Sequence, residues 1–247
     1  MKGIILAAGR GSRMGALTDE RPKCLTVMAG RTLLEWQMSA LRAAGVNDIA
    51  IVTGYKKELL EPLADKTFVN ERWAETNMLM SLACAAEWLR TDRCIVSYSD
   101  IFYSVLAIRS LMQCQQDICI TYDKNWLKLW ALRFGDPLSD AERFQLASDG
   151  SIAVIGGKAA SASEIEGQYM GLLSFTPQGW RNVEKYIESS GPGGVDRLDM
   201  TGLLARLIQS GHKIFAAKYE GEWGEVDSAT DLSLYERLVA EGQLKLS

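Results

Sequence analysis

A glycine-containing turn near the start of the chain is flanked by cations. The run "ILAAGRGSRMGALTDERPKCL", residues 5–25, starts apolar, passes through Gly9 and Gly11, and then carries Arg13 and Lys23. Glycines allow a backbone to approach a ligand closely. Cations and backbone N–H groups at such a turn favour an anion, most often a phosphate. The segment therefore predicts a phosphate-binding loop.

Two acids follow strand-like runs and could hold a metal ion. Asp100 ends "CIVSYSD" and Asp227 ends "WGEVD". Open α/β sheets bind ligands at the carboxyl ends of their strands, and carboxylates are ligands that Mg²⁺ prefers. Either acid could instead cap a following helix. After Asp227, however, Ser228 and Asp231 form an S-x-x-D box that could cap the helix in its place.

Composition argues against several classes of protein and of functional site. The 247 residues are 47% hydrophobic, and the net charge of −4 argues against a broad nucleic-acid-binding face. Five cysteines without a C-x-x-C pair favour neither a disulfide framework nor a zinc site. No apolar run approaches membrane-spanning length, so we expect a cytoplasmic protein with no membrane partner. The only histidine, His212, offers little support for a histidine base or a histidine-rich metal site.

Strand-like and helix-like runs alternate through the first half of the chain. "KGIILAA" precedes the helical pattern "TLLEWQMSALRAAG", and "DIAIVTG", "RCIVSYSD" and "DICITYD" continue the rhythm, with helices expected at "KKELLEPLA" and "NMLMSLACAAEWL". This alternation predicts a Rossmann-like, three-layer α/β/α domain with a mainly parallel mixed sheet. In the second half, "RFQLASDGSIAVIGG" predicts an inserted β-hairpin that turns at Asp149 and Gly150. We expect one domain over residues 1–247, since no linker interrupts the pattern.

Three types of phosphate loop compete for the glycine turn. The P-loop pattern G-x-x-x-x-G-K-[ST] is absent. The dinucleotide fingerprint G-x-G-x-x-G fits Gly9 and Gly11, but Met14 stands at its third glycine and no acid ends the second strand. The third type is more specific, because "LAAGRGSRM" followed by Pro22-Lys23 resembles the nucleotidyltransferases, which join a nucleoside triphosphate to a small phosphorylated molecule.

The resemblance to nucleotidyltransferases implies roles for the loop. The glycines would wrap the triphosphate, Arg13 would hold the outer phosphates, and Lys23 would stabilise the attacked α-phosphate. Fixed cations suit this chemistry, because charge builds on the phosphoryl oxygens during in-line displacement. Asp100 and Asp227 would bind Mg²⁺. The implied nucleotide-binding residues of the loop are Leu6, Ala7, Ala8, Gly9, Gly11 and Ser12.

Further segments resemble one bacterial branch of that family. "ETNMLMSL", "SYSDIFY", "DKNWLKLWALRFGDPLSDAE", "EIEGQYMGL", "LDMTGLL" and "WGEVDSATDL" are similar to the phosphocholine cytidylyltransferase-like branch. Its members use CTP with phosphocholine, 2-aminoethylphosphonate or phosphoglutamine, which implies CMP transfer to a small phosphorylated or phosphonate acceptor with release of pyrophosphate. Such an acceptor is ionised near neutral pH and needs no general base. A homodimer is compatible with this expectation.

Two other functions remain open. A sugar-1-phosphate nucleotidylyltransferase shares the loop chemistry, although its site would need many polar groups directed at hydroxyls. A non-catalytic nucleotide-binding subunit would be expected to lack Lys23 or a metal-binding acid, and this chain has all of them.

Candidate contacts to the base lie on two segments. Asn77 and Ser81 are one turn apart at the start of a predicted helix, where they could read a pyrimidine edge, or Asn77 could simply cap the helix. Gly54 and Tyr55 end a strand near the same crevice, where a plain turn is the equal alternative.

Aromatic residues offer walls for the acceptor. Trp126 and Trp130 are four apart and share one face if their segment is helical, either in the core or at the acceptor. The resemblance implies that Trp223 encloses a cationic head by a cation–π contact. Tyr169 is a second candidate wall. Glu166 could pair with an ammonium group or could be a solvated loop acid.

Overall fold

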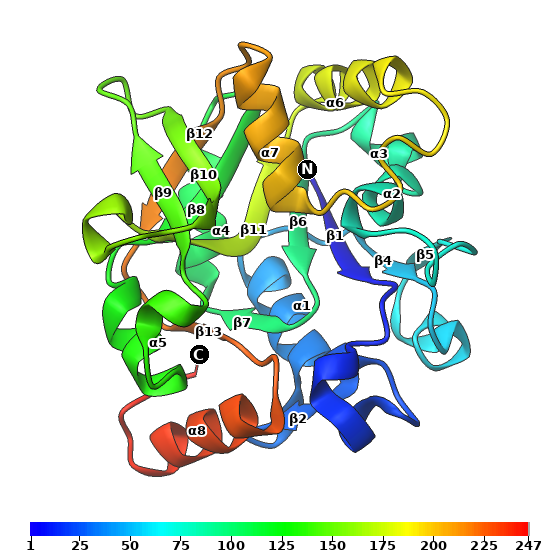
Figure 1. Cartoon of the computed structure of the whole chain (residues 1–247). Helices are drawn as coiled ribbons and strands as arrows, with labels where there is room; N and C mark the ends of the chain where they lie inside the picture. The colour runs from blue at the N-terminus through cyan, green and yellow to red at the C-terminus, as the bar shows by residue number, and fades with distance from the viewer. Residues whose placement is uncertain (247) are drawn as a thin grey trace.

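A twisted sheet forms the centre of the molecule in the computed structural model, which describes residues 1–246 (Figure 1). Its strands are β1 (Lys2–Ala7), β4 (Ile49–Thr53), β5 (Lys66–Val69), β6 (Cys94–Tyr98), β8 (Ile118–Asp123), β11 (Gln168–Phe175) and β12 (Phe215–Tyr219). They form a seven-stranded sheet in the order β12-β8-β11-β6-β1-β4-β5. Only β11 runs antiparallel to its neighbours β6 and β8. The predicted mixed, mainly parallel sheet is therefore confirmed.

The central strands β1 and β4 are almost entirely apolar because both faces of the sheet are buried there. Along β1, Ile4 and Leu6 join one core cluster, whereas Ile5 and Ala7 join the core cluster on the opposite face. Successive side chains of a strand point to opposite faces. A continuous apolar run is thus what a parallel strand covered on both faces requires.

Helices cover the two faces of the sheet (Figure 1). One face carries α2 (Met78–Ala83), α3 (Ala86–Leu89), α6 (Pro177–Ser189) and α7 (Met200–Gln209), and the other carries α1 (Leu33–Ala43), α4 (Val105–Gln113) and α5 (Trp126–Arg133). The last helix, α8 (Ala229–Ala240), buries Leu234 and Tyr235 in a smaller third cluster. No helix within residues 1–246 has the length and apolar character needed to cross a membrane.

Short elements connect these layers. The remaining strands are β2 (Val27–Met28), β3 (Arg31–Thr32), β7 (Ile101–Tyr103), β9 (Glu142–Leu146), β10 (Ile152–Lys158) and β13 (Trp223–Glu225). The 3₁₀ turns are η1 (Ser12–Thr18), η2 (Lys23–Leu25), η3 (Lys57–Leu59), η4 (Glu61–Leu63), η5 (Pro137–Ser139) and η6 (Ala162–Glu164). Strands β9 and β10 form the predicted hairpin, and Gly150 in its turn has a φ of 80°.

Two predicted helices are interrupted. The segment expected as one helix over residues 77–89 divides into α2 and α3 at Ala85, whose φ of −93° and ψ of 17° leave the helical region. Residues 57–63 form two 3₁₀ turns instead of a helix. Pro62 explains the second case, because it has no N–H to donate within a helix.

Candidate active site

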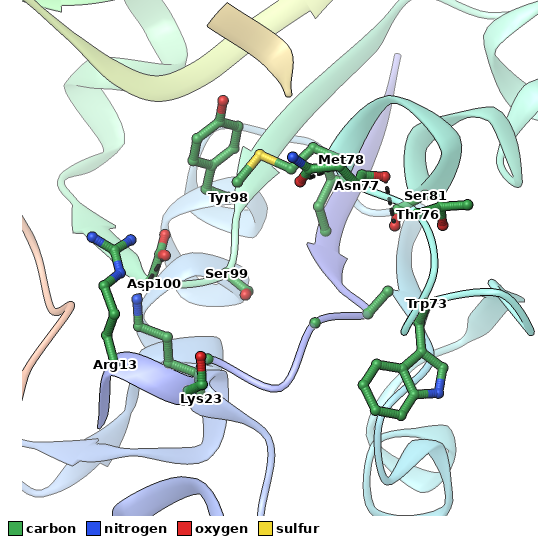
Figure 2. Close-up of a pocket in the computed structure, with 15 residues that line it drawn as sticks. Arg13, Lys23, Trp73, Thr76, Asn77, Met78, Ser81, Tyr98, Ser99 and Asp100 are labelled. Atoms are coloured by element: carbon green, nitrogen blue, oxygen red, sulfur yellow. Dashed lines mark hydrogen bonds and ion pairs between the residues drawn. The ribbon is translucent and has the colours of Figure 1, made fainter. Parts of the chain in front are cut away.

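A pocket of about 250 Å³ lies at the carboxyl end of β1, beside the glycine turn (Figure 2). Arg13, Lys23 and Asp100 stand on one side of it, and Trp73 and Asn77 on the other (Figure 2). Its lining residues are Leu6, Ala8, Gly9, Gly11, Ser12, Arg13, Lys23, Trp73, Thr76, Asn77, Met78, Ser81, Tyr98, Ser99 and Asp100. The predicted phosphate loop thus lines a cavity. Ala7 is buried beneath the loop and is not among the lining residues.

Gly11 allows Lys23 to reach the floor of this pocket. The φ of Gly11 is 71°, in the left-handed region, and a Cβ placed there would lie 2.8 Å from Cβ of Lys23. Any larger residue would suffer both backbone strain and a steric clash. The glycine therefore brings the loop and the lysine into direct contact.

Lys23 is buried between two carboxylates. Its Nζ lies 2.8 Å from Oδ2 of Asp100 and 2.5 Å from Oδ1 of Asp227. Burial alone would lower the pKa of Lys23, but the two carboxylates outweigh burial and raise it. Burial would likewise raise the pKa of Asp227, but Lys23 and Arg13, whose Nη2 is 2.9 Å from Asp227 Oδ1, lower it. Lys23 and Asp227 therefore both remain charged near neutral pH.

A two-stranded ribbon brings the two acids together although they are far apart in sequence. Strands β7 and β13 pair antiparallel, with Glu225 opposite Ile101. The pairing continues for one more residue, since the N–H of Val226 donates to the carbonyl oxygen of Asp100 at 2.9 Å. The next residue of the chain is Asp227, which therefore lies beside Asp100.

Neither acid caps a helix. Ser228 is the N-cap of α8 and forms a capping box with Asp231, as the S-x-x-D pattern predicts. Asp100 precedes strand β7, and α4 is capped by Ser104. The capping alternative is therefore wrong for both acids.

A third acid, Glu225, completes an acidic cluster. One carboxylate oxygen from each of Asp100, Glu225 and Asp227 lies within 4.8 Å of the others. Burial, together with Asp227 and Asp100, raises the pKa of Glu225 to about 8, while Arg133 and Lys23 oppose this rise. Oδ1 of Asp100 is buried and has no hydrogen-bond partner among the described residues. An unpaired oxygen among carboxylates fits a hard divalent cation such as Mg²⁺.

A second pocket, of about 170 Å³, lies on the far side of this cluster. Its lining residues are Arg13, Tyr98, Trp130, Asp140, Glu142, Tyr169, Met170, Gly171, Thr201, Trp223, Glu225 and Asp227. The two pockets share Arg13 and Tyr98. Asp100 lines the first pocket, whereas Glu225 and Asp227 line the second, so the acidic cluster lies between them.

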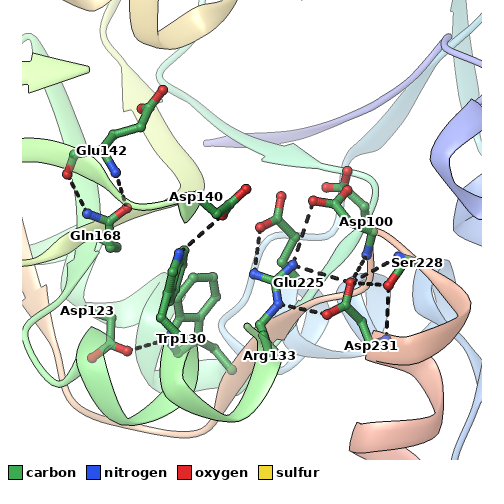
Figure 3. Close-up of polar contacts among 12 residues, drawn as sticks. Asp100, Asp123, Trp130, Arg133, Asp140, Glu142, Gln168, Glu225, Ser228 and Asp231 are labelled. Atoms are coloured by element: carbon green, nitrogen blue, oxygen red, sulfur yellow. Dashed lines mark hydrogen bonds and ion pairs between the residues drawn. The ribbon is translucent and has the colours of Figure 1, made fainter. Parts of the chain in front are cut away.

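Three of the predicted acceptor residues line the second pocket. Trp130 and Trp223 are buried, with ring centroids 6.1 Å apart, and Tyr169 packs edge-on against Tyr98 at 5.7 Å. The indole N–H of Trp130 donates to Asp140 at 3.1 Å (Figure 3). Aromatic rings therefore wall this pocket.

The other two acceptor candidates lie elsewhere. Trp126 is buried in the core, and its indole N–H donates to the carbonyl oxygen of Ile165 at 3.2 Å. Glu166 is exposed, and its carboxylate accepts from the N–H of Leu146 at 3.0 Å. The helical spacing of Trp126 and Trp130 was predicted correctly, but only Trp130 stands at the boundary between core and pocket.

The four residues predicted to contact the base also divide into two that line a pocket and two that do not. Asn77 lines the first pocket and also caps α2, since its Oδ1 accepts from the N–H of Met78 at 2.8 Å. Ser81 lines the pocket and accepts from Asn70 at 3.0 Å. Gly54 and Tyr55 do not line it.

Gly54 and Tyr55 instead support Trp73. A Cβ at Gly54 would lie 2.6 Å from Cβ of Trp73, so only glycine leaves room for the tryptophan. The ring of Tyr55 packs against that of Trp73 with centroids 5.3 Å apart. The prediction that these two residues belong to the pocket wall is therefore corrected.

Several site residues escaped the sequence analysis: Trp73, Thr76, Met78, Tyr98, Ser99, Arg133, Asp140, Glu142 and Glu225. The only available signals were that Trp73 stands in a polar segment and that Glu225 lies two residues before Asp227. Neither signal distinguishes a site residue from an ordinary surface residue.

Comparisons with known proteins find cytidylyltransferases among the relatives of this chain. The chain is 33% identical over 250 residues to the CTP:phosphoglutamine cytidylyltransferase of Campylobacter jejuni, covering 95% of this chain and 98% of that protein. It is 37% identical over 106 residues to the choline-phosphate cytidylyltransferase of Streptococcus pneumoniae, covering 41% of this chain and 46% of that protein.

Solved structures show the same fold. The inositol-1-phosphate CTP transferase of T. maritima superposes with a TM-score of 0.74 at 19% identity, over 96% of this chain and 95% of that one. The CTP:phosphocholine cytidylyltransferase of Streptococcus pneumoniae superposes with a TM-score of 0.71 at 22% identity, over 96% of this chain and 98% of that one. A match to the family described as the MobA-like NTP transferase domain covers residues 3–158. The chain therefore belongs to the MobA-like NTP transferase family.

Proposed function

We propose that this chain is a Mg²⁺-dependent cytidylyltransferase. It moves CMP from CTP to a small phosphorylated or phosphonate acceptor and releases pyrophosphate. The observation that carries the proposal is the position of Lys23, Arg13 and the acidic cluster between two pockets, one beside the glycine loop and one walled by aromatic rings. The full-length similarity to a CTP:phosphoglutamine cytidylyltransferase supports CTP as the nucleotide.

The loop and its cations bind and activate the triphosphate. Gly9, Gly11 and Ser12 line the first pocket, and Arg13 lines both pockets. Lys23 lines the first pocket and contacts Asp227, which lines the second. An oxygen of the acceptor attacks the α-phosphorus of CTP, and the bond to pyrophosphate breaks. Lys23 then meets the charge that builds on the α-phosphoryl oxygens. The acceptor oxygen is already ionised, so no side chain must remove a proton.

Asp100 and Asp227 hold the metal in this proposal, with Glu225 beside them. Bound there, Mg²⁺ neutralises triphosphate charge and helps to orient the reacting groups. The carboxylates lie between the pockets, at the place where the α-phosphate must meet the acceptor. Because Asp100 and Asp227 come from opposite halves of the chain, we also propose that residues 1–247 act as one domain.

The base and the acceptor are assigned to opposite ends of the site. Trp73, Asn77 and Ser81 line the first pocket at the end remote from Lys23 and are the proposed contacts to cytosine (Figure 2). In the second pocket, the rings of Trp130 and Trp223 are the proposed contacts to a cationic end of the acceptor. Phosphoglutamine, phosphocholine and aminoethylphosphonate, the compounds in the names of the relatives, each carry an ammonium group.

Pyrophosphate release across a substrate panel tests this function. Each of CTP, UTP, ATP and GTP is incubated with the protein, Mg²⁺ and one of four acceptors: phosphocholine, 2-aminoethylphosphonate, phosphoglutamine or glucose 1-phosphate. We expect release with CTP and a cationic acceptor. Release only with glucose 1-phosphate would favour a sugar-1-phosphate nucleotidylyltransferase. Binding of CTP without release in any combination would favour a non-catalytic subunit.

A further inference from the structure

Arg133, the last residue of α5, is buried behind the acidic cluster. Its side chain is 0% exposed, and it lines neither of the two pockets. Nη1 lies 3.0 Å from Oε2 of Glu225, and Nε lies 2.9 Å from Oδ1 of Asp231 (Figure 3). Arg133 therefore contacts the carboxylates without being able to contact a substrate in either pocket.

The cations around Asp227 stand on opposite sides of its carboxylate. Oδ1 faces Lys23 at 2.5 Å and Arg13 at 2.9 Å, whereas Oδ2 lies 3.7 Å from Nη2 of Arg133. Glu225 similarly directs Oε2 to Arg133. The charge-assisted hydrogen bond to Glu225 fixes the plane of that carboxylate and leaves its other oxygen for a second partner, whereas the longer contact with Asp227 is an ion pair without a hydrogen bond.

Asp231 connects Arg133 to the backbone of Asp227 and Ser228. Its Oδ2 accepts from the N–H groups of Asp227 and Ser228, each at 3.0 Å, while Oδ1 accepts from Arg133. Asp231 thus connects the start of α8, the backbone of Asp227 and the guanidinium. A shift of Arg133 would be transmitted to both the side chain and the backbone of Asp227.

The guanidinium itself has little freedom to move. It lies over the ring of Trp130 at 5.3 Å and over the ring of Phe134 at 5.0 Å. Burying a charged group costs free energy that its ion pairs offset only with good geometry. The planar guanidinium donates to Glu225 and Asp231 from two different nitrogens held in a fixed geometry, which the single nitrogen of a lysine cannot reproduce. The contacts therefore require arginine rather than any cation.

We infer that Arg133, acting with Asp231, is a positioning residue that holds Glu225 and Asp227 with one oxygen of each directed to a divalent cation. This inference rests on the proposed metal-binding role of Asp100 and Asp227. It assigns a function in metal binding to a residue that touches neither CTP nor the acceptor.

Metal affinity of the Arg133→Lys variant tests the inference. Mn²⁺ is titrated into the whole protein without nucleotide, and free Mn²⁺ is followed by electron paramagnetic resonance. Loss of an outer partner of a metal ligand typically weakens metal affinity about 10- to 100-fold, and we expect a loss in that range. In turnover assays the Mn²⁺ concentration for half-maximal rate should rise by a similar factor, while the KM for CTP at saturating Mn²⁺ changes little.

Arg93→Lys is the matched control. Arg93 is half-buried rather than fully buried, and it donates to the backbone carbonyl oxygens of Leu111, in α4, and of Cys114, just after α4. This variant should lose stability without losing Mn²⁺ affinity, so it separates a general packing defect from an effect on the cluster.

The possible results distinguish this inference from the metal site itself. If Arg133→Lys binds Mn²⁺ as tightly as the parent while Asp227→Asn binds weakly, the inference is overturned and the metal site stands. If Asp227→Asn and Asp100→Asn both bind like the parent, the metal site fails and the inference fails with it. Should Arg133→Lys not fold, Asp231→Asn replaces it, since asparagine keeps the shape but loses the ion pair, and parent-like Mn²⁺ affinity in that variant overturns the inference.

Discussion

Nζ of Lys23 lies 2.5 Å from Oδ1 of Asp227, and the same ammonium reaches Asp100 at 2.8 Å. The proposed catalytic cation thus bridges the two proposed metal ligands. The ammonium has three N–H donors and two already face the carboxylates, so at most one remains for the α-phosphate while this bridge persists. A divalent cation at the same carboxylates would, in addition, be repelled by it. We therefore expect Lys23 to leave the carboxylates when nucleotide and metal bind.

Replacement of Lys23 should change turnover and metal affinity in opposite directions. Lys23→Ala removes a cation from the α-phosphate, which typically costs roughly 10²- to 10³-fold in kcat. Without nucleotide, Mn²⁺ should bind roughly tenfold more tightly, because a repelling charge has left the carboxylates. Steady-state kinetics and Mn²⁺ titration measure the two effects. A near-normal kcat would show that the role assigned to Lys23 is wrong.

Removal of either proposed metal ligand should abolish most activity without unwinding α8. Asp227→Asn and Asp100→Asn each remove one of the carboxylates proposed to hold Mg²⁺ and leave the shape of the site unchanged, so Mg²⁺-dependent turnover should collapse. Ser228→Ala is the contrasting variant, because Ser228 is the N-cap of α8. It should lower the free energy of unfolding by about 1 kcal/mol. Unchanged Mg²⁺-dependent turnover in Asp227→Asn would count against metal binding by this residue.

Trp223 should select a cationic acceptor. Because Trp223 is buried and its indole N–H donates to Asp123 at 2.9 Å, an alanine would leave a cavity, and Trp223→Leu is the better test. An ammonium over an indole ring gains about 0.5–2 kcal/mol. The variant should lose roughly 2- to 30-fold in kcat/KM for such an acceptor, mainly through KM, with little change in the KM for CTP.

Trp126→Leu provides the control for this prediction. Trp126 is equally buried on the same helix as Trp130 but does not line the pocket. It should lose stability without a change in acceptor KM. Equal losses for cationic and uncharged acceptors in Trp223→Leu would indicate a packing role for Trp223 instead. Tyr169, which lines the same pocket, should share the preference for a cationic acceptor.

Gly11→Ala should displace Lys23 as well as strain the loop. A Cβ at position 11 would lie 2.8 Å from Cβ of Lys23, whereas a Cβ at Gly45, whose φ of 89° is also positive, would meet no atom within 4 Å. Each alanine should cost about 1–2 kcal/mol of backbone strain. Only Gly11→Ala should also reduce kcat strongly. Equal kcat in the two variants, measured below their melting temperatures, would contradict a role for the close approach of Gly11 and Lys23.

The sequence by itself determined the local features of this protein. The alternating apolar runs predicted the mainly parallel sheet, because a strand buried on both faces must be apolar throughout. Asp149 and Gly150 predicted the hairpin turn, and Ser228 and Asp231 predicted the cap of α8. The glycine loop with Lys23 predicted the first pocket. Each of these features depends on residues close together in the chain.

Only the tertiary structure decided which distant residues meet. The register of β7 against β13 places Glu225 and Asp227 beside Asp100. The tertiary structure also decided that Trp130 faces a pocket whereas Trp126 faces the core. In the first pocket, Trp73 lines the wall where Tyr55 was expected. Spacing along a helix or strand shows which side chains share a face, but what that face meets depends on the packing of other segments. The contacts of Arg133 with Glu225 and Asp231 arise for the same reason, since they join α5, β13 and α8.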